Sequence, residues 1–481
     1  MPCTTILVGK KASYNGSTII SRNDDGRFEV KKTIVVERNK APRKYKSVLS
    51  KVEIDLPDFS YRYTAHPNVY TKDRGLWSAC GINEYNVGMN ATETITSNPL
   101  VNGGDPLVEY EKARKGKKEK AGGIGEEDLV TLVLPYIKTA REGVIRLAEL
   151  IEKYGTYERN GLAFNDENEI WWFESIGGHH YVARRVPDDR MVIMPNQFGL
   201  DNFDFDDAFG AQKEHMCSKD LKEFIKENNL DLNLGNKFNP RLVFGSHTDQ
   251  DHIYNTPRAW FLLKYFAPKS YKYEGCNADF TPLSDDIPWS FVPEHKVTIQ
   301  EIKYVLGSYY QGTKYNPYGK EAEHGKYRSI GVPNTDVCGI EEIRKGLPAV
   351  EWASFGGGAF TCCFPTYTNV SKMPKFIGDY GMTVSTDSMY WMSRLIAAIT
   401  DAHFAKAVIF TERYQQAVFN KSYVILKEYD AKYLANPSEK VLEEANEKIV
   451  KMVKEESEKT LESVMNVASN SMKTRYNRED N

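Results

Sequence analysis

A cysteine and a run of charged residues near the start of the chain indicate nucleophilic chemistry. Cys3 stands in MPCTTILVG, and Arg-Asn-Asp-Asp follows at 22–25. A thiolate is the reactive form of cysteine, and a neighbouring arginine, charged at any working pH, lowers the pKa of a thiol. If segments 4–8 and 17–21 pair as a β-hairpin about a turn near Ala12, position 3 lies opposite position 22. The pattern therefore predicts a thiol, a guanidinium and two carboxylates at one end of one sheet.

A cysteine at the first position of a chain carries its own general base. Its α-amine titrates at about 7.7–8.0 and lies a few bonds from the sulfur. Removal of Met1 alone leaves Pro2 at the N-terminus, so we expect Met1-Pro2 to be lost before Cys3 acts, with self-cleavage as one route. The other interpretation is that Cys3 is a small buried residue at the start of a strand, as most cysteines are.

The composition argues against several classes of protein. Hydrophobic residues make up 41% of the 481 positions, enough for a sizeable core, and the formal net charge of −3 gives no sign of a nucleic-acid or membrane-surface partner. No apolar run reaches the roughly 18 residues of a membrane span, and TTILVG is too short for the core of a signal peptide. Seven cysteines without a C-x-x-C pair favour reduced thiols in a cytoplasm over disulfides or a structural zinc site.

The N-terminal two-fifths of the chain alternates strand and helix patterns. Short β-branched segments predict strands in the first hundred residues, and strand patterns return between about 160 and 198. Between them, apolar residues at helical spacing predict a helix over 126–154, which Pro135 kinks or splits. A basic, glycine-containing stretch at 112–123 predicts a surface loop.

The C-terminal part of the chain reads as helical. Apolar spacing predicts helices over about 387–414 and 418–429. A charged run from Ser438 to about Arg475 predicts one long amphipathic helix that packs on the body or on a partner subunit. Strands, a helix, strands and then helices form an α+β layout rather than a strict alternation of the two.

Other residue patterns carry less chemistry. The motifs G-x-G-x-x-G, G-x-S-x-G and H-E-x-x-H are absent, so nucleotide-binding, α/β-hydrolase and zincin functions lose their usual support. His179 and His180 are adjacent, and neighbours on a strand point to opposite faces, so we interpret them as structural. The run SHTDQDHIYNT at 246–256 is either a polar loop near the site, which we favour, or a site for a hard cation. Cys362 and Cys363 are predicted to pack in the core.

Several segments resemble one family. The opening CTTILVGKKASYNGSTIISRNDD resembles the N-terminus of the cysteine-dependent dipeptidases, the dipeptidase A type of N-terminal nucleophile hydrolase, and more distantly the bile salt hydrolase and penicillin V acylase group. The resemblance continues through GINEYNVGMNATET, GIGEEDLVTLVLPYIKTAREGVIRLAELIEKYG, GHHYVARRVPDDRMVIMPNQF and DHIYNTPRAW. It implies an αββα four-layer sandwich over residues 1–435, followed by a long C-terminal helix over 436–481.

The resemblance implies three residues at the nucleophile. Cys3 is the expected nucleophile and Arg22 its activating neighbour. Asp25, three residues after that arginine, matches the carboxylate that holds the amine of the nucleophile or of the substrate. The sequence leaves open which of Asp24 and Asp25 faces that amine.

Three more residues are implied by shorter matches. Asn90 in GMN matches the asparagine that the wider acylase group uses in its oxyanion hole, and Asn196 in MPNQF matches a second site asparagine. Arg258 in NTPRAW matches a site arginine. Amides aimed at a developing oxyanion are worth about 3–4 kcal/mol in comparable sites, and an arginine is suited to a substrate carboxylate.

The favoured interpretation is hydrolysis of dipeptides by the Cys3 thiolate, with the α-amine of the same residue as base and then acid. We expect a cytoplasmic homo-oligomer that requires no cofactor or metal and has no nucleic-acid or membrane partner. One alternative is an amidase of the same fold that acts on bile-salt or penicillin V amides. The other is a non-catalytic interaction protein that assembles through its C-terminal helix.

Overall fold

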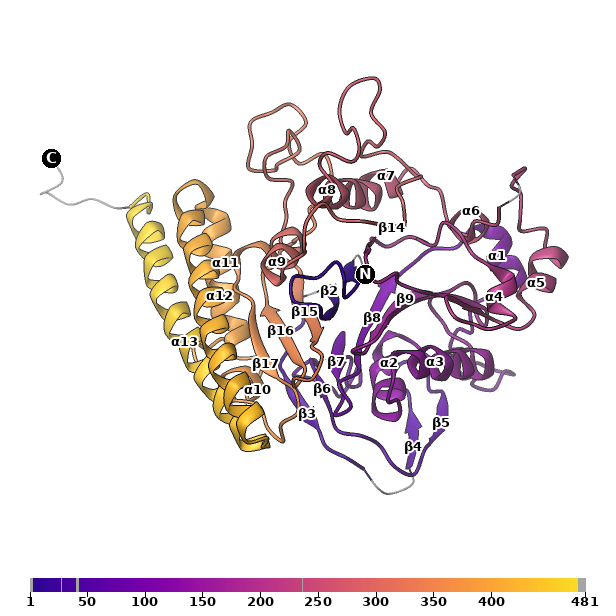
Figure 1. Cartoon of the computed structure of the whole chain (residues 1–481), viewed down its shortest axis with the longest axis horizontal. Helices are drawn as coiled ribbons and strands as arrows, with labels where there is room; N and C mark the ends of the chain where they lie inside the picture. The colour runs from indigo at the N-terminus through magenta and orange to yellow at the C-terminus, as the bar shows by residue number, and fades with distance from the viewer. Residues whose placement is uncertain (1–2, 27, 40–42, 236, 475–481) are drawn as a thin grey trace, which may run out of the picture.

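Two antiparallel sheets lie face to face and carry helices on their outer faces (Figure 1). The computed structural model describes residues 3–26, 28–39, 43–235 and 237–474, without the side chains of 91–93. The first sheet has seven strands in the order β14 (Ser290–Phe291), β12 (Met191–Met194), β1 (Thr4–Val8), β2 (Thr18–Asp25), β15 (Thr335–Ile343), β16 (Val350–Phe355) and β17 (Phe364–Tyr367). The second has six, β13 (His215–Cys217), β11 (Tyr181–Arg185), β10 (Ile170–Ser175), β9 (Asn160–Asn165), β8 (Gly88–Thr94) and β7 (Cys80–Ile82).

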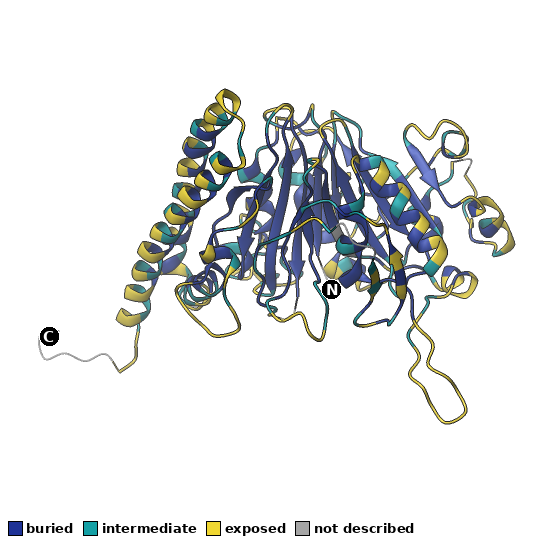
Figure 2. Cartoon of the chain, turned by 90° about the horizontal axis from the view of Figure 1, so that it is seen from below, coloured by how far each residue is buried: buried dark blue, intermediate teal, exposed yellow. Residues whose placement is uncertain are grey.

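Helices cover the outer face of each sheet. On the six-stranded sheet, α2 (Glu126–Val133) and α3 (Ala140–Tyr154) pack against β8, β9 and β10. On the seven-stranded sheet lie α8 (Thr256–Phe266), α9 (Ile299–Leu306), α11 (Met389–Ala402), α12 (Phe404–Ala435) and α13 (Glu439–Asn470). Figure 2 shows buried strands in the middle and helices whose outer sides are exposed.

Shorter elements complete the chain. Two small ribbons pair β3 (Ile34–Val36) with β6 (Tyr63–Ala65) and β4 (Arg43–Lys46) with β5 (Glu53–Leu56). The remaining helices are α1 (Pro99–Gly104), α4 (Phe205–Ala208), α5 (Leu221–Glu227), α6 (Pro240–Phe244), α7 (Asp251–Tyr254) and α10 (Lys375–Gly378), with 3₁₀ turns at Leu134–Tyr136 and Gly358–Phe360.

Alternation along the strands builds three apolar layers. On β1, Ile6 and Val8 belong to the layer beneath α8, α9 and α11–α13, whereas Leu7 belongs to the layer between the sheets. On β10, Trp171 and Phe173 face the third layer, under α2 and α3. The predicted αββα four-layer sandwich is therefore confirmed in the described part of the chain.

The helix boundaries follow local signals in most places. Pro135 divides the predicted 126–154 helix, as expected, because α2 ends in a 3₁₀ turn there and α3 begins after Thr139. The predicted start of the last helix is also confirmed, since the Ser438 hydroxyl caps α13 by accepting from the Val441 N–H. The predicted gap between 414 and 418 is wrong. The break lies at His403 instead, and α12 runs unbroken through residues without any helix breaker.

The basic stretch is a surface loop, as predicted. It is exposed from Glu111 to Lys120, and backbone bridges join Glu111 to Lys120 and Arg114 to Lys117. Among the described helices, none combines the length and the hydropathy needed to span a bilayer.

Helix α13 supplies hydrogen-bond partners to the backbone at the edge of the seven-stranded sheet. The buried Asn446 side chain accepts a hydrogen bond from the Tyr367 N–H at 2.8 Å and donates one to the Tyr367 carbonyl at 2.9 Å. We expect Asn446→Ala to lower the free energy of unfolding by about 2–4 kcal/mol, because two buried backbone groups lose their partner. Urea unfolding measures this, and Asn420→Ala on the exposed side of α12 is the control, with a change of about 0.5 kcal/mol or less. Equal effects of the two substitutions would contradict this role.

Candidate active site

The Cys3 sulfur receives a hydrogen bond from an arginine on the neighbouring strand. Cys3 is fully buried just before β1, and Arg22 Nη2 donates to its Sγ at 2.9 Å. The predicted register is wrong by two residues, since Thr5 pairs with Arg22 and the position opposite residue 3 is therefore 24. The centre of the hairpin lies between Ser13 and Tyr14, because the connection runs from a turn closed on the Gly9 carbonyl to Gly16, whose φ is 84°. Residues 3, 5, 22 and 24 share one face, so the long Arg22 side chain still reaches the sulfur diagonally.

Arg22 is a buried cation that two carboxylates compensate. Its Nη2 lies 3.0 Å from Glu126 Oε1 and 3.6 Å from Asp24 Oδ1, and only 2% of the residue is exposed. Asp24 Oδ2 in turn lies 3.0 Å from Lys31 Nζ. Burial raises the pKa of Asp24, but Lys31 and Arg22 outweigh it, and the pKa ends below its usual range. The cluster thus keeps a permanent positive charge against the sulfur, which stabilises a thiolate over a thiol.

The two aspartates after Arg22 have different partners. Asp24 lies beside Arg22, as described above. Asp25, one residue further along β2, pairs instead with Arg328 and accepts a hydrogen bond from Thr335 Oγ1 at 2.6 Å. Because successive side chains on a strand alternate, Asp24 is the carboxylate on the face of the Cys3 sulfur. The role of Asp25 at the amine stays a prediction.

Arg258 holds the main chain of Cys3. From α8, its Nη1 donates to the Cys3 carbonyl and, at 2.7 Å, to Thr4 Oγ1. Its Nη2 donates to Asn196 Oδ1 at 2.8 Å and to Asn255 Oδ1 at 2.7 Å. The guanidinium is completely buried, so in the structure Arg258 fixes the main chain at Cys3. Binding of a substrate carboxylate by Arg258 stays a prediction.

The two predicted asparagines lie in different networks. Asn196 joins the Arg258 network and also donates from Nδ2 to the Thr94 carbonyl at 2.9 Å. Asn90, on β8, is buried between the sheets, where its Nδ2 donates to Glu341 Oε2 at 3.1 Å. The structure thus links Cys3 to Arg22 and, through Arg258, to Asn196, whereas Asp25 and Asn90 have other hydrogen-bond partners. Oxyanion stabilisation by the asparagines is untested and stays a prediction.

Several residues of this site escaped the sequence analysis. Lys31 carried no local signal, since its partner Asp24 lies in β2. Asn255 stands three residues before Arg258 in the quoted NTPRAW segment but was given no role. Glu126 begins the acidic run GIGEED, which was noted as part of the resemblance but given no role. Asp251 accepts a hydrogen bond from Asn255 at 2.5 Å, so the polar segment at 246–256 lies next to the site, as favoured. The prediction of a loop is wrong for its second half, because residues 251–254 form α7 and Thr256 begins α8.

Carboxyl groups crowd around the start of α2. Glu126, Glu127 and Asp128 form its first turn, where the helix dipole favours negative charge, and Glu158 accepts from the Glu126 N–H at 2.6 Å. Burial and the charge of Glu126 raise the pKa of Glu158 to about 8. Burial and Glu127 raise the pKa of Asp128 to about 7. This side of Arg22 is therefore rich in carboxyl groups, of which Glu158 and Asp128 take up protons near neutral pH.

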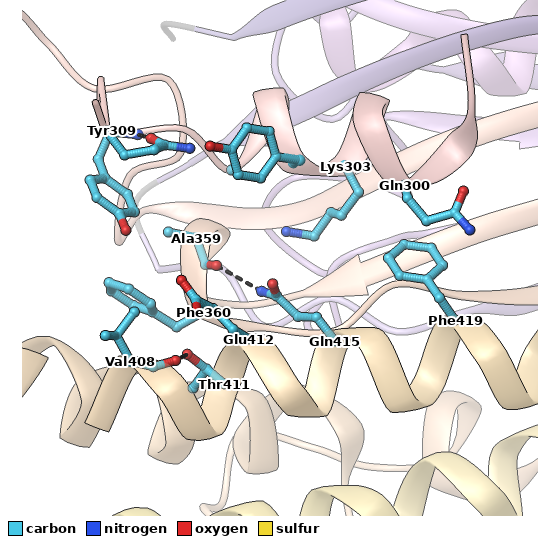
Figure 3. A pocket seen from close by; sticks show the side chains of 13 residues that line it. Gln300, Lys303, Tyr309, Ala359, Phe360, Val408, Thr411, Glu412, Gln415 and Phe419 are labelled. Atoms are coloured by element: carbon cyan, nitrogen blue, oxygen red, sulfur yellow. Dashed lines mark hydrogen bonds between the residues drawn. The ribbon is translucent and has the colours of Figure 1, made fainter. Parts of the chain in front are cut away.

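Two cavities of the described structure lie away from the nucleophile. A pocket of about 80 Å³ lies between α9 and α12, where Gln415 donates to the Ala359 carbonyl (Figure 3). A larger apolar cavity of about 730 Å³ is lined by α11 and the loops at 317–333. Cys3 lines neither of them.

Two other sequence predictions are resolved by the structure. His179 and His180 do not point to opposite faces, because they precede β11 and direct both Nδ1 atoms at Asp105, at 3.1 and 2.8 Å. Their structural role is nevertheless consistent with these contacts. Cys362 and Cys363 are fully buried in the core, as predicted.

Known proteins resemble the chain along its whole length. The profile of Peptidase family C69 matches residues 2–417. A dipeptidase from Bifidobacterium longum (strain NCC 2705) is 45% identical over 100% of both chains, and a probable dipeptidase A from Streptococcus pyogenes serotype M3 (strain SSI-1) is 44% identical over 100% of both. Among solved structures, penicillin V acylase from Agrobacterium tumefaciens matches 76% of this chain and 86% of its own with 14% identity and a TM-score of 0.34.

The raised pKa of Glu158 makes stability depend on pH. The Glu158 carboxyl binds a proton more tightly in the folded state than in the unfolded chain, where its pKa is near 4.5. The contribution of the protonated carboxyl to folding stability is therefore complete below pH 4.5 and is lost as pH rises through about 8. Glu158→Gln keeps the acceptor for the Glu126 N–H and removes the charge. We expect it to raise the free energy of unfolding by on the order of 1–2 kcal/mol at pH 9 and to change it little at pH 5. Urea unfolding at both values tests this, with the exposed Glu167→Gln as control. A gain of the same size at both pH values would contradict it.

Proposed function

The chain belongs to peptidase family C69 and is a peptide hydrolase, and we propose that it is a dipeptidase whose nucleophile is Cys3. The family and the dipeptidase relatives support the activity, and the resemblance seen in the sequence agrees with them. The single observation that supports Cys3 as the nucleophile is the hydrogen bond of 2.9 Å from the buried, charged Arg22 to the Cys3 sulfur. Neither the amidase nor the interaction-protein alternative is favoured by the relatives.

The proposed reaction begins after Met1-Pro2 is lost. The freed α-amine of Cys3 takes the thiol proton, and the thiolate, held by Arg22, attacks the carbonyl carbon of the peptide bond. The side-chain amides of Asn90 and Asn196 are the proposed donors to the oxyanion. The protonated α-amine then gives its proton to the leaving amine as the C–N bond breaks, which leaves a thioester on Cys3.

The second half of the reaction restores the enzyme. Water, deprotonated by the same α-amine, attacks the thioester carbonyl, and the thiolate leaves as the acid product forms. Asp24, whose side chain is on the face of the sulfur and whose pKa is lowered by Lys31 and Arg22, is proposed to hold the α-amine when it is protonated. Arg258 keeps the main chain of Cys3 fixed through both steps.

Selection of dipeptides is proposed to come from charged groups that hold the substrate termini. The free ammonium of a dipeptide is suited to the carboxyl groups around α2, namely Glu126, which pairs with Arg22, and Glu158, which accepts from the Glu126 N–H. A bound ammonium would favour the ionised form of Glu158, whose pKa is otherwise about 8. A peptide with more residues before the cleaved bond, or a dipeptide with a blocked amine, would leave these carboxyl groups without an ammonium partner, which is costly in a buried site.

We propose a cytoplasmic setting for the enzyme. All seven cysteines are free thiols, including the exposed Cys276, as suits a reducing compartment. Assembly into a homo-oligomer also stays a proposal.

Intact mass tests the nucleophile. We expect purified protein to have the mass of a chain that begins at Cys3, and Cys3→Ala to lose activity by about 10³-fold or more, because the attacking group is gone. If the cleavage is autocatalytic, Cys3→Ala also keeps Met1-Pro2. Cys276→Ala is the matched control, and we expect it to lose Met1-Pro2 and to hydrolyse dipeptides as the wild type does. Hydrolysis of dipeptides by pure Cys3→Ala at the wild-type rate would refute the proposal.

A substrate panel tests the dipeptide assignment. We expect free dipeptides to be hydrolysed with a kcat/KM at least about 100-fold above that of their N-acetyl forms, since a lost buried charge pair costs about 3 kcal/mol or more. Glu158→Gln should reduce this ratio, whereas Glu167→Gln should not. Preference for glycocholate or penicillin V over every dipeptide would support the amidase alternative instead.

A further inference from the structure

A second group of reactive side chains lies between the sheets, apart from the Cys3 sulfur. His66 follows β6, Cys80 opens β7, and Glu351 lies in β16. One ligand atom from each, the imidazole nitrogen, the thiol sulfur and a carboxylate oxygen, lie within 4.8 Å of one another. The exposed fractions are 0%, 1% and 0%. Three segments far apart in sequence therefore bring three different metal-ligand types to one buried point.

Two of these ligand atoms lie in direct contact. His66 Nε2 and Glu351 Oε1 are 3.0 Å apart, at ion-pair distance, yet within the described structure neither atom makes a hydrogen bond. Buried polar atoms are rarely left without a hydrogen bond. Two such atoms at this separation have the spacing of neighbouring ligands of one metal ion.

The far side of each ligand is already held. His66 Nδ1 lies 3.1 Å from Thr33 Oγ1, and Glu351 Oε2 accepts from Thr64 Oγ1 at 2.9 Å. Outer partners of this kind fix the ring and the carboxylate of metal ligands in orientation. The inner atoms, Nε2 and Oε1, are the ones left for an ion.

We propose that His66, Cys80 and Glu351 bind a zinc ion that braces the two sheets. Zinc takes nitrogen, sulfur and carboxylate oxygen at about 2.0–2.3 Å, which sets such ligand atoms about 3–4 Å apart, in keeping with the spacing here. Calcium and magnesium prefer oxygen alone, so the thiol and the imidazole argue against them.

Glu341 is the candidate for the fourth position. It is the cross-strand partner of Glu351, and its buried Oε1 has no hydrogen-bond partner in the described structure. A Cβ on Gly339 would lie 2.3 Å from Cys80 Sγ and 2.9 Å from Glu341 Oε1, so the sulfur and this oxygen lie close together beside Gly339. A divalent cation would compensate the negative charge that these residues bring into the interior.

The proposed ion has a structural role and supplies no step of the proposed reaction, although its candidate ligand Glu341 also accepts the hydrogen bond of Asn90. It ties β6 and β7 to β16, the strand beside β15 in the other sheet. Gly339, against which Cys80 packs, is the strand partner of Arg22, so the ion would support the strand behind that arginine. The alternative is a metal-free network in which protons neutralise the cluster, consistent with the raised pKa values of Cys80 and Glu341 caused first by burial.

The metal content of the full-length protein distinguishes the zinc site from the metal-free proton network. We expect protein produced with added zinc and washed with EDTA to retain about one zinc per chain by elemental analysis. After removal with a stronger chelator, added Co²⁺ should give a thiolate-to-cobalt charge-transfer band. Cys80→Ser should abolish this band, while Cys3→Ala and Cys276→Ser should keep it, which separates this site from the nucleophile and from the exposed thiol.

The test does not depend on the folding of one variant. If Cys80→Ser fails to fold, the wild-type protein decides, because chelation should lower its melting temperature by several degrees and zinc should restore it. Wild-type protein that carries no zinc and gives no cobalt band would overturn the proposal in favour of the proton network. Loss of the band in Cys3→Ala would overturn it as well, since the ion would then sit on the nucleophile.

Discussion

Burial of the Arg22 guanidinium is the constraint on which the rest of the site depends. A cation deprived of water costs several kcal/mol unless it is paired and hydrogen-bonded. Arg22 is 2% exposed in a central strand, and it meets this need through Glu126 from α2, Asp24 from its own strand and the sulfur of Cys3. The first turn of α2 must therefore lie within reach of β2, which fixes the helix layer, the second sheet and Cys3 relative to one another.

The sequence predicted what local periodicity encodes. The first hairpin, the division of 126–154 at Pro135 and the cap at Ser438 all follow from patterns within a few residues of one another. The four layers were implied by the family resemblance, not by these patterns. The register of the hairpin was wrong by two residues because its centre lies between Ser13 and Tyr14, one residue beyond the predicted centre, and the geometry of a long connection is not read from the flanking strands. The break at His403 was missed since neither side of it carries a proline or glycine.

The partners of the site residues lie beyond the reach of such patterns. Arg258 and Cys3 are 255 positions apart, and Asn255 matters only because it supplies an acceptor for that arginine. The acidic run at 126–128 was visible, but three-dimensional packing decides that its first member pairs with Arg22 while Asp128 pairs with Tyr45. The family resemblance identified candidate site residues in the sequence, but it did not predict their contacts. Asp25 and Asn90 illustrate this, because both have hydrogen-bond partners other than Cys3.

Charge balance explains why a cysteine with a free amine suits this place. Arg22 and Lys31 bring two positive charges to the cluster, and Asp24 and Glu126 bring two negative ones, so the four together are neutral. A thiolate alone would add an unpaired negative charge to this buried group, whereas a thiolate with its own ammonium adds none. Arg22 holds the sulfur and Arg258 holds the carbonyl of the same residue. With those two atoms fixed, the α-amine has little freedom left and lies within a few bonds of the reacting atom, so most of the orientation needed for proton transfer is established before substrate binds.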